Sequence, residues 1–346
     1  MAAVKGSILV TGANGGLGAA IVNQIASSPD LSTHHGLYTV RDANSAPALN
    51  TVLKNNPSHP HDVLSLDLTD LANVRSVAQT INTRVSSGTL PPLRALILNA
   101  GFQDFGHQTQ TKDGLDTTFV SNYLGHWLLT LLLLQSIDKS HGRIVILGSQ
   151  SHDKLTPAPS SPEDKRNAMS NPFSYKSNKY RTMLTPTSNL SAIAHGTWSP
   201  STEDPSWHSG FRRYGAAKLC CVMMLHELQA RLDRDASLKD ICVLGVDPGA
   251  MSTSMARNAP WFIRVLIFKV AFRVATWWGG VRTVERSAGD VVWGAMEGVR
   301  GGYFDGRKAM ETSGEARERE KREVVWRESV GFAGLGEGET VLGEWR

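Results

Sequence analysis

The chain has 346 residues, of which 41% are hydrophobic and 20% are charged, a composition typical of a folded globular protein and unlike that of a disordered, collagenous or repeat protein. One elaborated α/β domain is expected, because such a core commonly takes up to about 250 residues and the remainder must form insertions or tails. The net charge of +4 is mildly basic, but the charges are mixed and no Lys/Arg run contains interleaved aromatic residues, which argues against a nucleic-acid partner.

Residues 7–40 predict a β-α-β unit, in which a strand, a glycine-rich turn, a helix over residues 19–26 and a strand over residues 37–40 follow one another. The pattern then repeats. Short apolar runs typical of strands buried on both faces occur at residues 63–66, 95–98, 144–147 and 242–246. Helical stretches separate them, at residues 71–85, 114–137 and 216–232. The alternation predicts a Rossmann-type α/β fold, a doubly wound parallel sheet flanked by helices, with ligands at the carboxyl ends of the strands.

Two regions interrupt this alternation. Residues 153–213 contain seven prolines among many Ser, Thr and Asn residues and predict a long loop insertion, a kind of segment that is usually functional or disordered. Residues 260–278 are rich in aromatic and aliphatic side chains but include Arg264, Lys269 and Arg273, which argues against a membrane-spanning helix. We favour a substrate-covering helix here, with a basic amphipathic helix in peripheral contact with a membrane surface as the alternative.

Two features bear on the compartment. The first apolar run, Ile8 to Val10, is followed at once by a glycine-rich turn, so it predicts a short strand and not a signal peptide. The cysteines are Cys220, Cys221 and Cys242; they lack metal-ligand spacing, which indicates packing residues in a reducing compartment and no metal site. We therefore expect a cytoplasmic protein.

The glycine-rich turn from Thr11 to Gly18 joins the first strand to the first helix. Its glycines allow a tight turn and a close approach of the backbone to a pyrophosphate at the positive end of a helix. A turn of this kind alone is also compatible with no ligand, so the remaining motifs decide its meaning.

From this turn onward the sequence resembles the classical short-chain dehydrogenase/reductase family. The family's cofactor motif T-G-x-x-x-G-x-G is matched in full, and five more segments follow in the family's order. The matching residues are Thr11, Gly12, Gly16 and Gly18; Leu98-Asn99-Ala100-Gly101, with Leu98 in place of an Asn; Asn122; residues 142–149, ending in Ser149; Tyr214-Gly215-Ala216-Ala217-Lys218; and Asp247-Pro248-Gly249, followed by Thr253.

The resemblance implies one domain with distinct parts. Residues 1–150 form mainly the dinucleotide-binding half, residues 153–213 the loop insertion, residues 214–310 the catalytic helix and substrate-covering region, and residues 311–346 a C-terminal extension. The family's habit of association implies a homodimer or homotetramer.

A second Y-x-x-x-K begins at Tyr175, which is nearer in sequence to Ser149. It lies among Asn, Ser and Pro residues, whereas Tyr214 opens an apolar helical stretch on which a tyrosine and a lysine four residues apart share one face. We therefore assign the motif to Tyr214 and Lys218.

The assigned motif has a chemical logic. A free tyrosine titrates near pH 10, and a cation at Lys218 is expected to lower the pKa of Tyr214 towards the working range of a general acid–base catalyst. The resemblance implies that Ser149 hydrogen-bonds the reacting oxygen, that Lys218 also holds the nicotinamide ribose and that Asn122 anchors a water. These catalytic residues imply hydride transfer between a carbonyl and an alcohol, with Tyr214 as the acid in reduction.

Cofactor choice depends on the end of the second strand, where an acidic residue binds the ribose 2′-hydroxyl and an arginine accepts a 2′-phosphate. Arg41 follows Val40 directly and Asp42 comes next, which resembles NADP-using members; Asp42 keeps NAD as the alternative. We therefore expect NADP(H). The resemblance implies these cofactor-binding residues: Gly12, Asn14, Gly16, Leu17, Gly18, Arg41, Asp67, Leu68, Asn99, Ala100, Gly101, Tyr214, Lys218, Pro248, Gly249 and Thr253.

The long connection after Ser149 resembles the retinol-dehydrogenase-like branch of the family and its fungal biosynthetic relatives. That branch implies a bulky apolar small molecule, such as a secondary metabolite or a retinoid-like or steroid-like compound, for which Trp261, Phe262 and Trp278 would suit the pocket. A different hypothesis is a non-catalytic NADPH-binding sensor or interaction protein. The intact Ser, Tyr and Lys set argues against it.

Overall fold

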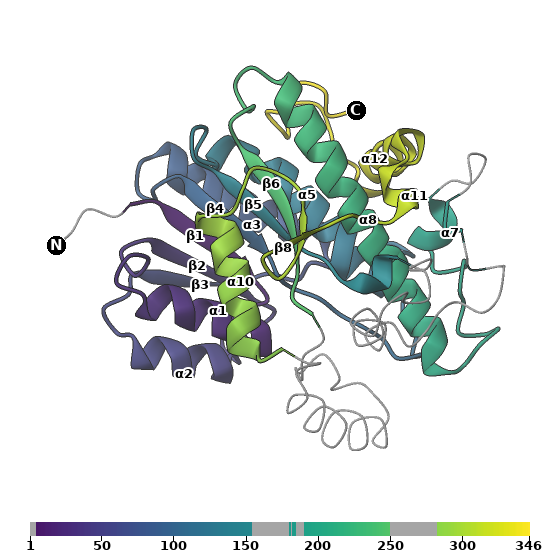
Figure 1. Ribbon diagram of the computed structural model, residues 1–346, viewed down its shortest axis with the longest axis horizontal. Helices are drawn as coiled ribbons and strands as arrows, with labels where there is room; N and C mark the ends of the chain where they lie inside the picture. Colours follow the sequence, from purple (N-terminus) through teal and green to yellow (C-terminus); the bar gives the residue numbers. More distant parts are fainter. Residues whose placement is uncertain (1–4, 154–179, 181, 185–189, 250–281) are drawn as a thin grey trace.

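A computed structural model gives the structure of the protein (Figure 1). It describes residues 5–153, 180, 182–184, 190–249 and 282–346. Several predictions fall outside the described residues, namely those on Tyr175, Thr253, the segment 260–278 and much of the insertion.

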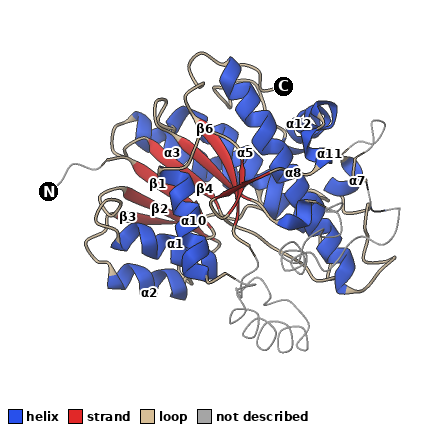
Figure 2. Ribbon diagram, viewed as in Figure 1, coloured by secondary structure: helices blue, strands red, loops and turns tan. Residues whose placement is uncertain are grey.

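One eight-stranded sheet forms the centre of the molecule (Figure 2). Its strands are β1 (Ser7–Thr11), β2 (His35–Val40), β3 (His61–Ser65), β4 (Leu93–Leu98), β5 (Arg143–Leu147), β6 (Cys242–Asp247), β7 (Tyr303–Asp305) and β8 (Lys308–Met310). Their order is β3-β2-β1-β4-β5-β6-β7-β8, parallel from β3 to β7, with β8 antiparallel to β7. The strand order reverses between β1 and β4, the kind of position at which open α/β sheets bind ligands. The predicted doubly wound parallel sheet is confirmed.

Helices cover both faces of the sheet (Figure 1). One face carries α1 (Gly16–Ser27), α2 (Pro47–Asn55) and α10 (Val284–Met296), and the other carries α3 (Leu71–Ser86), α5 (Gly125–Leu133) and α8 (Trp207–Arg234). Successive strand residues enter different cores, since Leu9 belongs to one hydrophobic cluster and Ile8 and Val10 belong to the other. Strands buried on both faces explain why their sequences are continuous apolar runs.

The predicted insertion ends earlier than expected. A short helix, α7 (Ser191–Ala194), lies within it, and α8 already begins at Trp207. Pro205 is the last proline of the region, and the Ser206 hydroxyl accepts from the His208 amide as an N-cap. Residues 207–213 are therefore helical and not part of a loop, which corrects the boundary at Arg213.

The predicted helix over residues 114–137 is shorter and irregular. It starts as α4 (Thr117–Phe119), where the Asp116 carboxylate accepts from two first-turn amides. A π-helical turn at Val120–Leu124 follows, and after α5 a 3₁₀ turn at Leu134–Ser136 ends the segment. Turns of the π type often mark functional sites, and this one contains Asn122.

Besides the four-residue helices α7 and α11 (Gly314–Arg317), the sequence analysis did not predict α2, α10 and α12 (Arg319–Ala333). Helix α2 is short, buries only Leu49 and Leu53, and begins without a side-chain cap from its own segment. By contrast, α10 buries Ala288, Val291, Val292 and Ala295 on one face, a helical periodicity that was readable in the sequence.

The C-terminal extension holds the described part of the insertion. Glu315 of α11 (Gly314–Arg317) accepts from the Met183 and Leu184 amides at 3.0 and 2.7 Å. Glu328 of α12 accepts from the Leu190 amide at 2.6 Å. Through these two carboxylates, α11 and α12 bind Met183, Leu184 and Leu190, which lie more than a hundred residues earlier in the chain. In Figure 1, α11 and α12 lie near α7 and α8.

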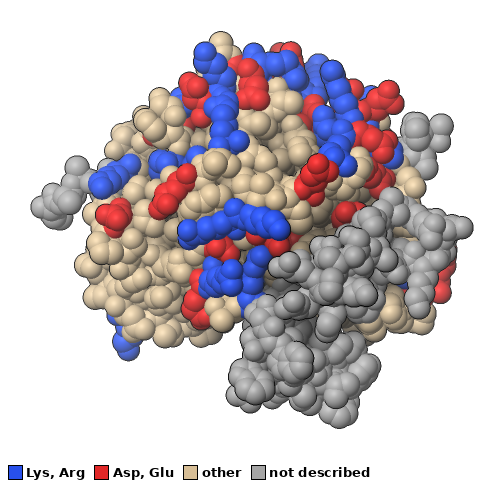
Figure 3. All heavy atoms as spheres, in the orientation of Figure 1, with Lys and Arg blue, Asp and Glu red and all other residues tan. Residues whose placement is uncertain are grey.

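The described surface is mixed in charge. On the face shown in Figure 3, basic and acidic side chains are interspersed. Among the helices of the described ranges, none is both long enough and apolar enough to span a bilayer.

Candidate active site

A cleft of about 640 Å³ lies at the carboxyl ends of β1 to β6. Every predicted site residue within the described ranges lines it, except Asn122. They are Gly12, Asn14, Gly16, Leu17, Gly18, Arg41, Asp67, Leu68, Asn99, Ala100, Gly101, Ser149, Tyr214, Lys218, Pro248 and Gly249. The long connection between Ser149 and Tyr214 thus returns the chain to the same cleft.

The glycine-rich turn is shaped for close approach. Gly12 has a φ of +67°, and a Cβ atom there would lie 2.9 Å from the Cα atom of Ala100. At Gly18 a Cβ atom would lie 2.2 Å from the Gly12 carbonyl oxygen. Larger residues are excluded at both positions. Because first-turn amides lack partners within their own helix, the start of α1 at Gly16 presents free donors to the cleft.

Polar side chains fix this turn against the next strand of the sheet. The Asn99 amide nitrogen donates to the Thr11 carbonyl oxygen at 2.8 Å, and the Ala100 amide donates to the Thr11 hydroxyl at 3.0 Å. The His126 ring contacts the same hydroxyl at 2.9 Å, and burial lowers the pKa of His126 to about 3. This buried ring is therefore neutral.

Asn14 has a structural partner that the sequence did not reveal. Its Oδ1 atom accepts from the Ala48 and Leu49 amides at 2.9 and 3.2 Å. These are first-turn amides of α2, which Ala46 cannot cap. Asn14 therefore joins the turn to α2 as well as lining the cleft.

Tyr214, Lys218 and Ser149 all line the cleft. Tyr214 and Lys218 lie one turn apart on α8 and are 6% and 4% exposed. The Lys218 ammonium donates to the Leu147 carbonyl oxygen at 2.8 Å and lies 5.6 Å from the centroid of the Tyr214 ring. Ser149 lies two residues after the end of β5, where its hydroxyl accepts from the Ser151 hydroxyl at 3.0 Å, and it lowers the pKa of the neighbouring Tyr214 phenol. The structure therefore brings the phenol, the ammonium and the hydroxyl into the same cleft.

Lys218 lowers the pKa of Tyr214 as predicted, but the net pKa does not move towards neutral pH. Burial raises the pKa of Tyr214 above its ordinary value, and Lys218 and Ser149 lower it without overcoming the burial. Removal of water disfavours the phenolate, and one neighbouring cation does not compensate for it. Tyr214 is consequently a protonated phenol at neutral pH, the form that a proton donor requires.

Asn122 lies outside the lining of the cleft, and its side chain is fully engaged. Its Nδ2 atom donates to the carbonyl oxygens of Phe102 and Thr118, each at 2.7 Å, and its Oδ1 atom accepts from the Phe102 amide at 3.1 Å. Its main-chain carbonyl oxygen accepts from the Cys221 thiol at 3.3 Å. The side chain therefore anchors the loop after β4 to the π-helical turn, a role the sequence did not indicate.

Arg41 and Asp42 differ in how they are engaged. Both side chains are exposed at the end of β2. The Asp42 carboxylate accepts from the Asn44 amide at 2.9 Å, whereas the Arg41 guanidinium has no hydrogen bond or ion pair with any described residue. An unpaired arginine beside a cleft is available to an anionic ligand.

Asp67 keeps one carboxylate oxygen for a ligand. Its Oδ1 atom accepts from the Thr69 amide at 2.9 Å and from the Thr69 hydroxyl at 2.7 Å. Its Oδ2 atom makes no hydrogen bond to a residue of the described ranges. This oxygen is therefore an acceptor that remains open to the cofactor, which Asp67 is predicted to bind.

Several residues of the cleft were not assigned to the site by the sequence analysis, among them three phenylalanines and Asp247. Phe102, Phe105 and Phe211 contribute apolar rings to the lining, here called the apolar wall, and Asp247 places a carboxylate beside Pro248. Asp247 is 3% exposed, and its Oδ2 atom finds no partner among the described residues. Asp247 directly follows the predicted strand at residues 242–246, and this position could have indicated a site residue. The phenylalanines lie outside any periodic pattern.

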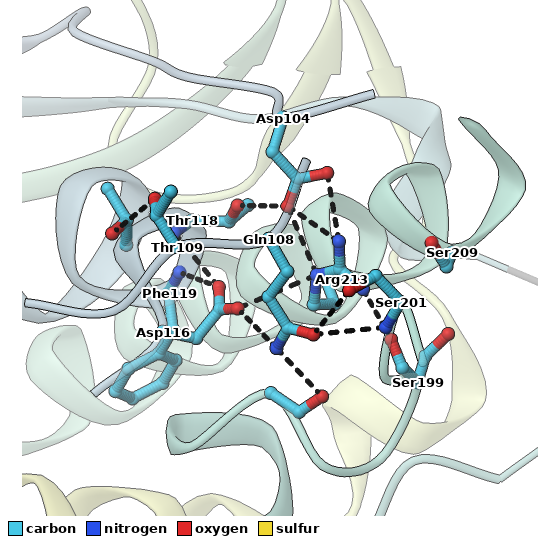
Figure 4. A network of polar contacts seen from close by, with 12 residues as sticks. Asp104, Gln108, Thr109, Asp116, Thr118, Phe119, Ser199, Ser201, Ser209 and Arg213 are labelled. Atoms are coloured by element: carbon cyan, nitrogen blue, oxygen red, sulfur yellow. Dashed lines mark hydrogen bonds and ion pairs between the residues drawn. The ribbon is translucent and has the colours of Figure 1, made fainter. Parts of the chain in front are cut away.

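A buried polar network includes Asp104, the residue that precedes Phe105 in the chain (Figure 4). Arg213, next to Tyr214, forms a bidentate ion pair with Asp104, in which Nη2 donates to Oδ1 at 2.9 Å and Nε donates to Oδ2 at 3.1 Å. Asp116 lies 3.5 Å from Arg213. Burial raises the pKa of Asp116, and Arg213 counteracts the rise. The three side chains connect the helix that carries Tyr214 to the loop that carries Phe105.

Fold and cleft define a Rossmann-type nucleotide-binding protein with a tyrosine–lysine–serine centre. A model of the short chain dehydrogenase family matches residues 6–159. The short-chain dehydrogenase iccH of Talaromyces variabilis is 40% identical over 365 aligned residues, which cover 99% of this chain and 99% of that protein. The chain belongs to the short-chain dehydrogenase/reductase family of oxidoreductases.

Two solved structures share the fold. The NADPH-bound carbonyl reductase from chicken fatty liver matches with a TM-score of 0.56 at 17% identity, covering 88% of this chain and 98% of the reductase. The angucycline C-6 ketoreductase LanV with bound NADP has a TM-score of 0.55 at 17% identity, covering 87% of this chain and 93% of the ketoreductase.

Proposed function

We propose that this protein is an NADP(H)-dependent oxidoreductase that interconverts a carbonyl and an alcohol, acting as a reductase of a bulky apolar ketone or aldehyde. The observation that carries the proposal is the convergence of Tyr214, Lys218 and Ser149 in one cleft. Bound NADP(H) would supply or accept the hydride at the reacting carbon.

The three side chains have complementary roles in reduction. The protonated Tyr214 phenol donates its proton to the substrate oxygen as negative charge develops there. Ser149 donates a hydrogen bond to the same oxygen and keeps it in line with the phenol. Lys218 stabilises the phenolate left on Tyr214 through its positive charge, which already lowers the pKa of that phenol.

The cleft fits a dinucleotide. The free amides of the first turn of α1 accommodate a pyrophosphate, and Gly12 and Gly18 keep side chains away from it. Arg41 offers an unpaired guanidinium for a 2′-phosphate, while Asp42 is already held by the Asn44 amide. This difference favours NADP(H) over NAD(H), as do the ligands named for the two solved structures of the same fold.

The phenylalanine rings of the cleft support the proposed substrate class. Phe102, Phe105 and Phe211 present aromatic surface to the cleft, and such surface favours an apolar ligand through removal of area from water. The carbonyl carbon of the substrate would lie between the apolar wall and the hydroxyls of Tyr214 and Ser149.

NADPH consumption against ketones and aldehydes graded by size and polarity tests the proposal. Turnover is expected with bulky apolar carbonyl compounds and is expected to fall as the substrate becomes smaller and more polar. Binding of NADPH without consumption on any carbonyl would instead support the sensor hypothesis.

A further inference from the structure

Phe105 has an unusual backbone conformation at the wall of the cleft. Its φ is +52°, the only positive value for a non-glycine residue in the described ranges. Left-handed backbone is unfavourable for a residue with a large side chain, and such outliers persist where the surroundings enforce them. The ring is 8% exposed and lines the cleft.

The enforcing contacts come from Asp104. Its Oδ1 atom accepts from the Gly106 amide at 2.7 Å, which closes a tight turn around Phe105. Its Oδ2 atom accepts from the Thr118 hydroxyl at 3.1 Å. Arg213 donates to both oxygens, and the side chains of this pair are 3% and 1% exposed. A buried bidentate pair fixes the orientation of both partners.

The turn also packs directly against α8. A Cβ atom at Gly210 would lie 2.0 Å from the Asp104 Oδ1 atom and 2.9 Å from the Phe105 amide nitrogen. Only glycine allows this approach. Gly210 and Tyr214 are one helical turn apart and share a face of α8. The wall and the phenol are therefore linked through one rigid helix.

We propose that Phe105 determines substrate selectivity as the apolar wall facing Tyr214, and that the Arg213–Asp104 pair is the positioning device that holds it there. This inference rests on the proposed function. It assigns to the enzyme a preference for carbonyl compounds with an aromatic or alicyclic group beside the reacting carbon. Loss of the pair releases Phe105 without removing any group of the tyrosine–lysine–serine centre.

The test measures kcat/KM for a bulky apolar ketone and for a small polar ketone, with saturating NADPH. In F105A the ratio of the two values is expected to fall at least about tenfold, since differences in buried apolar contact change discrimination by this order. In R213K the ratio should fall in the same direction, because lysine keeps the charge but not the bidentate geometry. Affinity for NADPH should stay unchanged in both.

Arg212 supplies the matched control. It is the neighbouring arginine on the same helix and pairs with Asp204 at 2.6 Å, and neither residue lines the cleft. R212K should leave the ratio at its wild-type value. The double variant F105A/R213K should show the same ratio as F105A alone, because Arg213 acts through Phe105.

An unchanged ratio in F105A would overturn the inference while leaving the proposed function intact. Additive effects in the double variant would overturn the positioning role of Arg213. Should R213K fail to fold, D104N tests the same pair with a side chain of equal shape. Absence of reduction of every carbonyl by the wild-type protein would remove the proposed function, and the inference with it.

Discussion

Asp247 is a buried carboxyl group whose charge should be costly for folding. Burial raises its pKa from 3.8 to about 6, with a further rise from Asp305 and opposing effects of the Gly249 amide, Arg282 and Lys218. Replacing it with Asn in D247N keeps the shape and one acceptor for the Gly249 amide, which Asp247 now binds at 2.8 Å. The substitution removes only the ionisation.

The magnitude follows from the raised pKa. The folded state binds the proton more tightly than the unfolded state, so the contribution of Asp247 to stability is complete below pH 3.8 and is lost as the pH rises to about 6. A difference of about two units corresponds to about 3 kcal/mol. At pH 8, the free energy of unfolding of D247N should therefore exceed that of the wild type by up to about 3 kcal/mol. At pH 4, the difference between the two proteins should be only a small part of this value.

Urea unfolding of both proteins across this pH range measures the difference. Equal stabilities at pH 8 would refute the reasoning, as would a gain that is the same at pH 4.

D247N should also change the pH dependence of activity. The charge of Asp247 raises the pKa of Tyr214, so D247N should shift the pH dependence of alcohol oxidation to lower pH.

Three further predictions concern the cofactor turn and its support. R41A should weaken NADPH binding at least about tenfold through loss of a charge-assisted contact and leave NADH binding nearly unchanged; equal losses by fluorescence titration would exclude a 2′-phosphate contact. G18A should abolish NADPH binding and lower the free energy of unfolding by about 1–3 kcal/mol, because its methyl group would overlap the Gly12 carbonyl. Burial keeps His126 neutral, so its contribution to stability is complete above pH 6.5 and is lost as the pH falls towards 3. The free energy of unfolding of the wild type should therefore fall with decreasing pH between pH 6 and 4. H126Q should reduce this dependence by about 1.4 kcal/mol per pH unit. An unchanged slope in urea titrations would contradict that assignment.

Much of the fold was predictable because buried parallel strands and their helices leave strong local patterns. The strand runs at residues 8–10, 95–98 and 144–147 were read correctly, and the glycines of the first turn indicated a tight turn with close backbone approach. The extent of α8 was missed because proline-rich sequence before Ser206 obscured the start of a helix whose packing depends on Gly210 and a distant loop.

The candidate site also contains some residues that the sequence predicts and others that it does not. Residues in short motifs, such as Tyr214 and Lys218, were found because their spacing matches that of the family. Phe105 and its support by Arg213 depend on a contact between segments about a hundred residues apart, which no local pattern encodes. The net pKa of Tyr214 likewise depends on how completely the folded chain excludes water, a tertiary property that the sequence did not supply.

The central claim is that the Tyr214 phenol transfers the proton during carbonyl reduction. Its most direct test compares the wild type with Y214F, by measuring single-turnover NADPH oxidation in the presence of a bulky ketone together with NADPH affinity. Loss of oxidation by at least about a hundredfold with unchanged affinity is the predicted result. Oxidation by Y214F at the wild-type rate would contradict the account.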